Sequence, residues 1–342
     1  MKQLSGYMHG VNLGGWLSQC DNTKERYDTF ITKKDFETIK SWGLDHVRIP
    51  VDYMLVETED GQYKEEGFAY IQKAIDWCKE LGLNMILDLH KTCGYSFDSK
   101  KNNFFENPLL HERFYKLWEQ FAQRFAKNEE MLCFELLNEV TLQSYGKLWN
   151  QMINTCIGRI RKIAPTIKIL VGSYWNNSVA AVKDLDPPYD ENIVYNFHCY
   201  EPLLFTHQGA PWLGEQMNHD FRLPLETTFA EYGTLSEQKC GQNFFIDSNL
   251  FKPDEVPTTK YFETLFKEAL EIAEKRNVAL YCGEFGVIDR TDQKEIIKWY
   301  KLICSVLDKY NIGRAAWSYK QMDFGISDAR MDCVRDELLK LL

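Results

Sequence analysis

The sequence predicts an α/β protein built as one (β/α)8 TIM barrel, in which eight parallel strands alternate with helices. Short apolar segments recur eight times, and most of them begin 25 to 47 residues after the one before. They are apolar along their length, which is typical of parallel strands covered by helices. An open doubly wound sheet is the alternative, but its phosphate-binding signatures are absent. The expected strands are Met8–Leu13, Asp45–Ile49, Asn84–Leu89, Met131–Leu136, Lys168–Gly172, Ile193–Phe197, Ala279–Cys282 and Gly313–Trp317.

Helical segments between these strands carry start and stop signals. Thr32 is an expected N-cap with Asp35 in the first turn of the helix, and Gly43 stands where a left-handed residue ends it. Apolar positions at helical spacing predict three further helices, at Phe68–Leu81, Phe114–Phe125 and Tyr261–Ala273.

The interval between the sixth and seventh strands is too long for one strand–helix unit. After its helix is assigned, residues 203–258 remain, and they are irregular and rich in Phe, Asn, Gly and Pro. A structureless loop of that length is unusual inside a compact domain. We therefore expect a single domain, residues 1–342, with an inserted subdomain at 203–258 on the C-terminal rim of the barrel.

Charge and hydropathy limit the possible partners. The chain has 40 basic and 50 acidic residues, a net charge of −10, whereas nucleic-acid phosphates attract basic surfaces. No apolar run is long enough to span a membrane, and no apolar leader follows Met1. We therefore expect no nucleic-acid or membrane partner. As written, the chain is expected to be cytoplasmic, or secreted if a signal has been removed, and to be a monomer.

The ten cysteines are scattered along the chain without any C-x-x-C pair. This spacing argues against zinc ribbons and thioredoxin-like redox chemistry. Cys133 and Cys282 lie in apolar runs, where a free thiol behaves as a small hydrophobic group. We expect reduced and mostly buried thiols.

Two glutamates follow strands that lie on opposite sides of the predicted barrel. Glu139 follows the fourth strand, and Glu284 ends the seventh. Active sites of such barrels form at the C-terminal ends of the strands, so the two carboxyls should face each other across the barrel mouth. A lone glutamate at a strand end is usually a solvated rim charge. Two carboxyls that flank one bond are what glycoside cleavage requires, and the pair therefore predicts this chemistry.

Arg48 lies inside the apolar second strand. A buried guanidinium needs a carboxylate partner, and this could be Glu284 or a structural carboxylate in the barrel core. Tyr200, just after the sixth strand, is expected to donate a hydrogen bond to Glu284.

His90 and His198 stand at the ends of the third and sixth strands. Two histidines could bind a metal, but no third ligand has suitable spacing, and hydrogen bonding to sugar hydroxyls fits better. Trp317, at the end of the eighth strand, offers a flat apolar face for a sugar ring unless it is a core residue. We expect no metal and no cofactor.

Seven motifs, in order along the chain, make the sequence similar to glycoside hydrolase family 5 of clan A, and in particular to bacterial cellulases of the endoglucanase C type. The likeness covers essentially the whole chain, which is a much stronger signal than any single motif. The motifs are GVNLGGW at 10–16, HVRIP at 46–50, LDLH at 87–90, FELLNE at 134–139, NFHCY at 196–200, GEFG at 283–286 and AAWSY at 315–319.

The resemblance implies a retaining hydrolase that uses Glu139 as acid/base and Glu284 as nucleophile. Lys91 departs from the pattern, because many family members have a second histidine at this position. The resemblance also implies a set of residues around the substrate, namely Arg48, His90, Asn138, His198, Tyr200 and Trp317.

Substrate choice is expected to depend on the loop at 92–101 and on the insertion, including His207 and Trp212, which is an expected substrate contact. The resemblance favours polysaccharide degradation by endo-hydrolysis of β-1,4 or mixed-linkage β-glucan. Within the family, the alternatives are a mannan or glucomannan hydrolase and an exo-β-1,3-glucanase. From other classes, they are a non-catalytic carbohydrate-binding barrel and a metal-dependent hydrolase.

Overall fold

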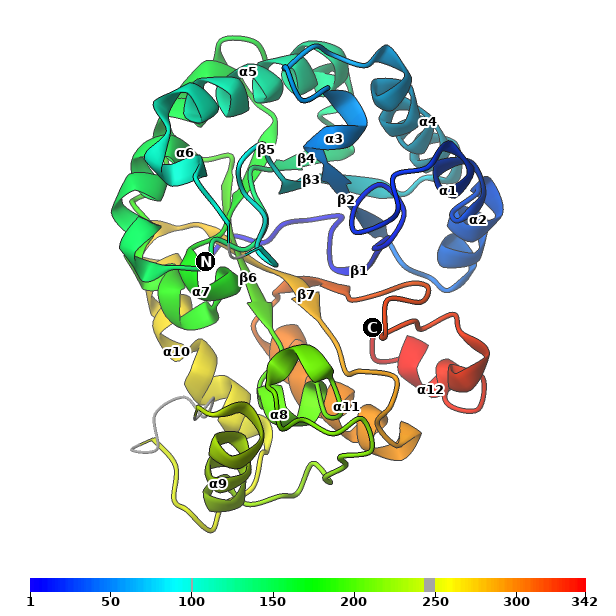
Figure 1. Cartoon of the computed structure of the whole chain (residues 1–342), viewed down its shortest axis with the longest axis vertical. Coiled ribbons are helices and arrows are strands. Elements are labelled where there is room, and N and C mark those ends of the chain that lie inside the picture. Colours follow the sequence, from blue (N-terminus) through cyan, green and yellow to red (C-terminus); the bar gives the residue numbers. More distant parts are fainter. Residues whose placement is uncertain (100, 243–249) are drawn as a thin grey trace.

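Eight parallel strands close into a barrel in the order β1 to β8, with β8 paired to β1. The computed structural model describes residues 1–99, 101–242 and 250–342. All eight predicted strands are confirmed, and Figure 1 shows them enclosed by helices. The strands are β1 His9–Asn12, β2 His46–Asp52, β3 Asn84–Lys91, β4 Leu132–Glu135, β5 Lys168–Val171, β6 Ile193–Cys199, β7 Ala279–Phe285 and β8 Gly313–Ala316.

The long helices carry amphipathic sequences and bury their apolar faces against the barrel. At the start of α2, Thr32 and Asp35 form a capping box, and Gly43 follows its end with a φ of 83°. Gly82 ends α4 in the left-handed conformation, as predicted. These helices are α2 Lys33–Ser41, α4 Glu65–Leu81, α5 Pro108–Phe125, α6 Gly146–Arg161, α10 Thr259–Arg276 and α11 Gln293–Lys309.

Two buried tryptophans on neighbouring helices hold the strand ends that carry the site. The indole of Trp118 on α5 donates to the carbonyl oxygen of Leu136, just after β4, at 3.0 Å. The indole of Trp149 on α6 donates to Gly172, just after β5, at 2.9 Å. Each bond satisfies a backbone carbonyl where the strand ladder stops, so the helices fix the exits of both strands.

Shorter elements occupy the loops between strands and helices. The α-helical ones are α1 Lys24–Thr29, α3 Tyr53–Val56, α7 Tyr174–Asn177, α8 Leu203–Thr206, α9 Phe229–Cys240 and α12 Arg335–Leu339. The 3-10 turns are η1 Phe104–Glu106, η2 Ala126–Asn128, η3 Gln143–Tyr145, η4 Val179–Asp184, η5 Pro211–Leu213 and η6 Ala329–Met331.

The long segment between β6 and α10 contains α8, η5 and α9. In Figure 1, α8 and α9 lie on the side of the barrel that carries α10 and α11. Residues 243–249 of this segment lie outside the described residues, as does Lys100 in the loop at 92–101. The interpretation of 203–258 as an inserted subdomain therefore stays a prediction.

Two further expectations from the sequence can be compared with the structure. All ten cysteines carry free thiols, and Cys133 and Cys282 are buried, as expected. Among the described residues, none of the helices has the length and apolar composition that crossing a membrane would need.

Candidate active site

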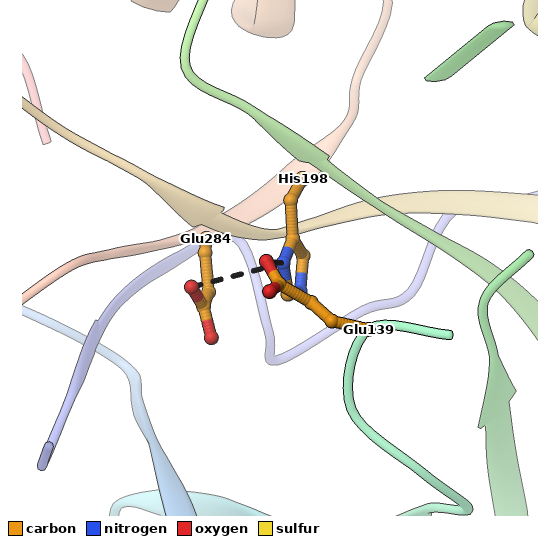
Figure 2. Close-up of side chains that lie close together, drawn as sticks. All are labelled: Glu139, His198 and Glu284. Atoms are coloured by element: carbon orange, nitrogen blue, oxygen red, sulfur yellow. Dashed lines mark hydrogen bonds and ion pairs between the residues drawn. The ribbon is translucent and has the colours of Figure 1, made fainter. Parts of the chain in front are cut away.

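Glu139 and Glu284 meet at the mouth of the barrel, as the strand count predicts. One carboxylate oxygen of each and a ring nitrogen of His198 lie within 4.8 Å of one another. Figure 2 shows the three side chains converging from separate segments. The glutamates are only 8% and 5% exposed, so both carboxyls are largely removed from water.

The backbone at Glu139 is held in an unusual conformation. Its φ is 43°, a left-handed value that is uncommon for a residue other than glycine. The hydroxyl of Tyr95 donates to the carbonyl oxygen of Glu139 at 2.8 Å and accepts from the amide of Thr141 at 2.9 Å. Tyr95 therefore bridges the chain on both sides of the bend and holds the Glu139 side chain toward the barrel mouth.

Both carboxylate oxygens of Glu284 accept hydrogen bonds. Nη1 of Arg48 donates to Oε1 at 2.7 Å, and the hydroxyl of Tyr200 donates to Oε2 at 2.9 Å. These are the two contacts expected from the sequence. Charge-assisted donors at this range stabilise the ionised form of a carboxyl and fix the direction in which its oxygens point.

Arg48 has more partners than the sequence suggested. Its Nε and Nη2 donate to the two oxygens of Glu135 at 2.7 and 2.8 Å, and Nη2 lies 3.0 Å from Oδ2 of Asp88. The side-chain oxygens of Asn12 and Asn138 each accept a further bond at 2.9 Å. Every arm of the guanidinium is therefore engaged, and its plane is fixed by the bidentate contact with Glu135.

Three buried carboxylates thus share one buried guanidinium. Burial raises the pKa of Asp88 to about 7 and also raises the pKa of Glu135, while Arg48 lowers both. Asn196 donates to the Glu135 carboxylate at 2.8 Å, which adds a neutral donor to the cluster. The cluster is a rigid base beneath Glu284, because moving Arg48 would disturb all three carboxylates at once.

Glu139 and His198 have environments that favour different protonation states. Burial raises the pKa of Glu139, and the side-chain amide of Asn176, which donates to Oε2 at 3.0 Å, opposes this. Burial lowers the pKa of His198 to about 4, so its imidazole is neutral near pH 7. Nδ1 of His198 lies 2.8 Å from Oε1 of Glu139. A carboxyl with a raised pKa is suited to proton donation.

His90 and Trp317 form another side of the site. Their rings stack with centroids 5.8 Å apart and an interplanar angle of 6°. Nδ1 of His90 is bonded to Asp88 at 2.6 Å, whereas its buried Nε2 has no hydrogen-bond partner among the described residues. A buried nitrogen without a partner is costly unless a ligand satisfies it, and a sugar hydroxyl would do so. Trp317 is only 7% exposed and packs with Phe324, so it is closer to a core residue than to an open platform.

The long segment between β6 and α10 reaches the site through His207. Its ring lies 5.0 Å from that of Tyr200 and 6.4 Å from that of Trp212, and the Trp212 side chain is 56% exposed. His207 therefore lies between Tyr200 and Trp212, and Trp212 is further from the two glutamates than the other predicted site residues. Lys91 points to the loop that follows β3 and pairs with Asp98 at 2.9 Å.

A metal ion is the remaining chemical possibility for the pair of glutamates and His198. Zinc bonds to nitrogen and oxygen are about 2.0–2.2 Å long, so two ligands of one ion lie at most about 4.4 Å apart. The three donor atoms lie within 4.8 Å of one another, and Nδ1 of His198 is already at hydrogen-bond distance, 2.8 Å, from Oε1 of Glu139. Glu284 also already accepts from Arg48 and Tyr200, so its oxygens are arranged for hydrogen bonding.

Sequence reasoning missed several residues of this site. Glu135 and Asp88 lie inside apolar strand motifs, and a charged residue in such a run is itself a signal of a buried partner. Asn12, Asn176 and Asn196 gave weaker signals, because an asparagine near a strand end is more often part of a turn.

Residues 8–323 match the model of the cellulase family, glycosyl hydrolase family 5. Cellodextrinase A of Ruminococcus flavefaciens is 43% identical over 92% of this chain and 86% of its own length. Endoglucanase C of Acetivibrio thermocellus is 39% identical over 97% of both chains.

Solved structures have the same fold as this chain. Cellulose synthase subunit Z from Clostridioides difficile superposes with a TM-score of 0.77 at 28% identity, over 98% of this chain and 99% of that one. Thermotoga maritima Cel5A in complex with cellobiose gives a TM-score of 0.76 at 25% identity, over 98% and 97%.

Proposed function

Because the chain belongs to glycosyl hydrolase family 5 and is a glycoside hydrolase, we propose that it cleaves β-glucan chains by a retaining double displacement. The observation that carries the proposal is the buried pair Glu139 and Glu284, with carboxylate oxygens within 4.8 Å of each other. Retaining enzymes place their carboxyls about 5–5.5 Å apart, whereas inverting enzymes need about 6.5–9.5 Å to admit a water molecule.

In the first step, Glu284 attacks the anomeric carbon and forms a bond to it. The glycosidic bond breaks as Glu139 passes its proton to the leaving oxygen. Arg48 and Tyr200 hold the two oxygens of Glu284, so the carboxylate is oriented before the substrate arrives. The negative charge of Glu284 is neutralised when the ester bond forms, and the leaving sugar departs with the proton of Glu139.

In the second step, Glu139 acts as base. It removes a proton from a water molecule, whose oxygen bonds to the anomeric carbon while the ester to Glu284 breaks. The sugar leaves with its original configuration, and both carboxyls return to their starting states. His198, neutral and 2.8 Å from Glu139, stays near both carboxyls without adding a cation that would hold Glu139 ionised.

The substrate proposal is an endo-acting hydrolase of β-1,4 or mixed-linkage glucan. Two similar proteins, a cellodextrinase and an endoglucanase, favour a cellulose-like chain over mannan or β-1,3-glucan. The two names differ in the length of glucan they suggest. We further propose that the segment 203–258, which reaches Tyr200 through His207, sets this length preference.

A product profile tests the substrate proposal. Initial rates are compared on barley β-glucan, carboxymethyl-cellulose, glucomannan and laminarin, and product sizes are followed with time. We expect barley β-glucan or carboxymethyl-cellulose to be cleaved fastest, with oligosaccharides of several lengths appearing early in the reaction. Preference for glucomannan or laminarin, or release of a single small product from the start, would overturn the linkage or the endo assignment respectively.

A further inference from the structure

The loop after β5 contains three consecutive residues in the left-handed conformation. Trp175, Asn176 and Asn177 have φ values of 52°, 56° and 56°, so this stretch of α7 is a short left-handed turn. Asparagine tolerates this region, whereas tryptophan rarely adopts it because its Cβ comes too close to the following carbonyl oxygen. Strain that persists in a fold points to a role for the segment that adopts it.

The turn is attached to the segments that carry Glu139 and His198. The backbone N–H of Asn176 donates to the carbonyl oxygen of Val140, the residue after Glu139, at 3.0 Å. Ser178, which follows the turn, forms a parallel bridge with His198 on β6. The turn is therefore held on one side by the segment after Glu139 and on the other by β6 at His198.

One asparagine side chain of the turn contacts the acid/base carboxyl, and the other contacts His198. Nδ2 of Asn176 donates to Oε2 of Glu139 at 3.0 Å. Nδ2 of Asn177, a buried residue, lies 3.4 Å from Nε2 of His198. Gly172 makes room for the second contact, because a Cβ atom there would lie 2.2 Å from the side-chain oxygen of Asn177.

The contact with Asn177 selects one tautomer of His198. An amide nitrogen can only donate, so Nε2 of the neutral imidazole must accept. The ring proton then resides on Nδ1, which donates to Oε1 of Glu139. Together with Asn176, this gives each oxygen of Glu139 a donor, an arrangement that suits the ionised carboxylate better than the protonated acid.

We propose, on the basis of the proposed role of Glu139, that the turn 175–177 is a positioning element for the acid/base carboxyl. Asn176 holds one oxygen directly, and Asn177 holds the other through the tautomer of His198. The turn thus favours the ionised form that must act as base in the second step, and so balances burial, which favours the protonated form needed in the first.

Other groups around Glu139 also affect its proton, and they come from several strands. Arg48 and His90 lower its pKa, while Glu284 opposes a second negative charge nearby. Substitutions within the turn leave all of these groups in place. The ionisable groups facing Glu139 are Arg48 on β2, Asp88 and His90 on β3, Tyr95 after β3, His198 and Tyr200 at the end of β6, and Glu284 on β7.

The test is the pH profile of kcat/KM for cellotetraose, whose basic limb reports loss of the proton from the general acid. Asn176→Gly keeps the left-handed backbone and removes the amide, so the limb should move up by about one pH unit. Asn176→Asp places a negative charge beside Glu139 and should move it further. Asn177→Gly should move it in the same direction. Asn154→Ala on α6, whose amide contacts Asp186, is the matched control and should leave the profile unchanged.

A leaving-group comparison separates this role from a merely structural one. Dinitrophenyl β-cellobioside needs little proton donation, so Asn176→Gly should leave its kcat/KM at neutral pH close to the wild-type value. Glu139→Gln should abolish the basic limb for cellotetraose. If the limb persists in Glu139→Gln, the proposed function fails. If Glu139→Gln behaves as expected but the profiles of Asn176→Gly and Asn176→Asp coincide with that of the wild type, only the role of the turn is overturned.

Discussion

Replacing Arg48 by alanine is expected to cause a large and pH-dependent loss of stability. Arg48 is fully buried and donates to Glu135, Glu284, Asn12 and Asn138, with Asp88 at 3.0 Å. Without it, three buried carboxylates remain together without this cation. Removing one partner of a buried ion pair costs about 3–5 kcal/mol. Whole domains are stable by about 5–15 kcal/mol, so the variant should lose about a fifth of its free energy of unfolding or more.

The pH dependence has a definite sign. Burial raises the pKa of both Asp88 and Glu135 above their unfolded values, and Arg48 lowers both. Without Arg48 the folded chain keeps protons to higher pH, and stability is lost as pH rises through the raised pKa values. The wild type and the variant differ in their free energy of unfolding. For each extra proton that the folded variant holds, this difference grows by about 1.4 kcal/mol per pH unit. For Asp88, the difference in unfolding free energy should therefore begin to grow near pH 7, where this carboxyl of the wild type loses its proton.

Urea unfolding at several pH values, followed by tryptophan fluorescence, measures this loss. Arg314→Ala is the matched control, because Arg314 is also buried but its partner Asp308 has a side chain that is 57% exposed. That variant should lose less stability, with no widening at high pH, and should keep its activity. Arg48→Ala should also lose nearly all kcat/KM. Equal, pH-independent losses in the two variants would refute the idea that Arg48 neutralises the buried cluster.

Two further substitutions test single contacts of the site. Asp88→Asn should flatten the pH dependence of unfolding, because the stability from a carboxyl with a pKa of about 7 is complete at low pH and is lost as pH rises through that value. Urea unfolding at about pH 4 and pH 7 checks this, and a slope equal to that of the wild type contradicts it. Tyr95→Phe leaves the carbonyl of Glu139 and the amide of Thr141 without their shared partner, which should cost about 1–3 kcal/mol and lower kcat. Thermal unfolding and steady-state kinetics test the second prediction, which fails if both match the wild type.

Most of the barrel could be predicted because its signals are local. Apolar runs mark the strands, and Thr32, Gly43 and Gly82 mark helix ends through backbone chemistry that needs no distant partner. Helix starts were less accurate. The helix predicted from Phe114 begins at Pro108, because Asn107 caps it and proline is favoured in the first turn.

Some residues of the site could also be predicted from local sequence, whereas others depend on contacts between distant segments. Glu139 and Glu284 stand at strand ends and were predicted as a facing pair, with Arg48 and Tyr200 as expected partners of Glu284. The contact of Glu139 with His198 was not predicted. Roles that depend on which way a strand faces were not predicted. Glu135 points into the barrel beneath the site, and the sequence alone does not give that direction.

Trp317 and the left-handed turn show the same limit. Sequence alone offered Trp317 as either a sugar platform or a core residue, and packing against Phe324 and His90 makes it mostly buried. The pair Asn176 and Asn177 is a local signal for left-handed backbone. Its position beside Glu139, however, depends on the closure of the barrel, which brings the loop after β5 against the end of β4.

Azide rescue of the two glutamate variants tests the central claim most directly. With dinitrophenyl β-cellobioside, Glu284→Ala should be inactive until azide takes the place of the nucleophile and forms the α-glycosyl azide. Glu139→Ala should still form the ester at Glu284, which azide then opens to the β-glycosyl azide. NMR of the two products gives the answer. The account predicts α from Glu284→Ala and β from Glu139→Ala; reversed products, or turnover of Glu284→Ala at the wild-type rate without azide, would contradict it.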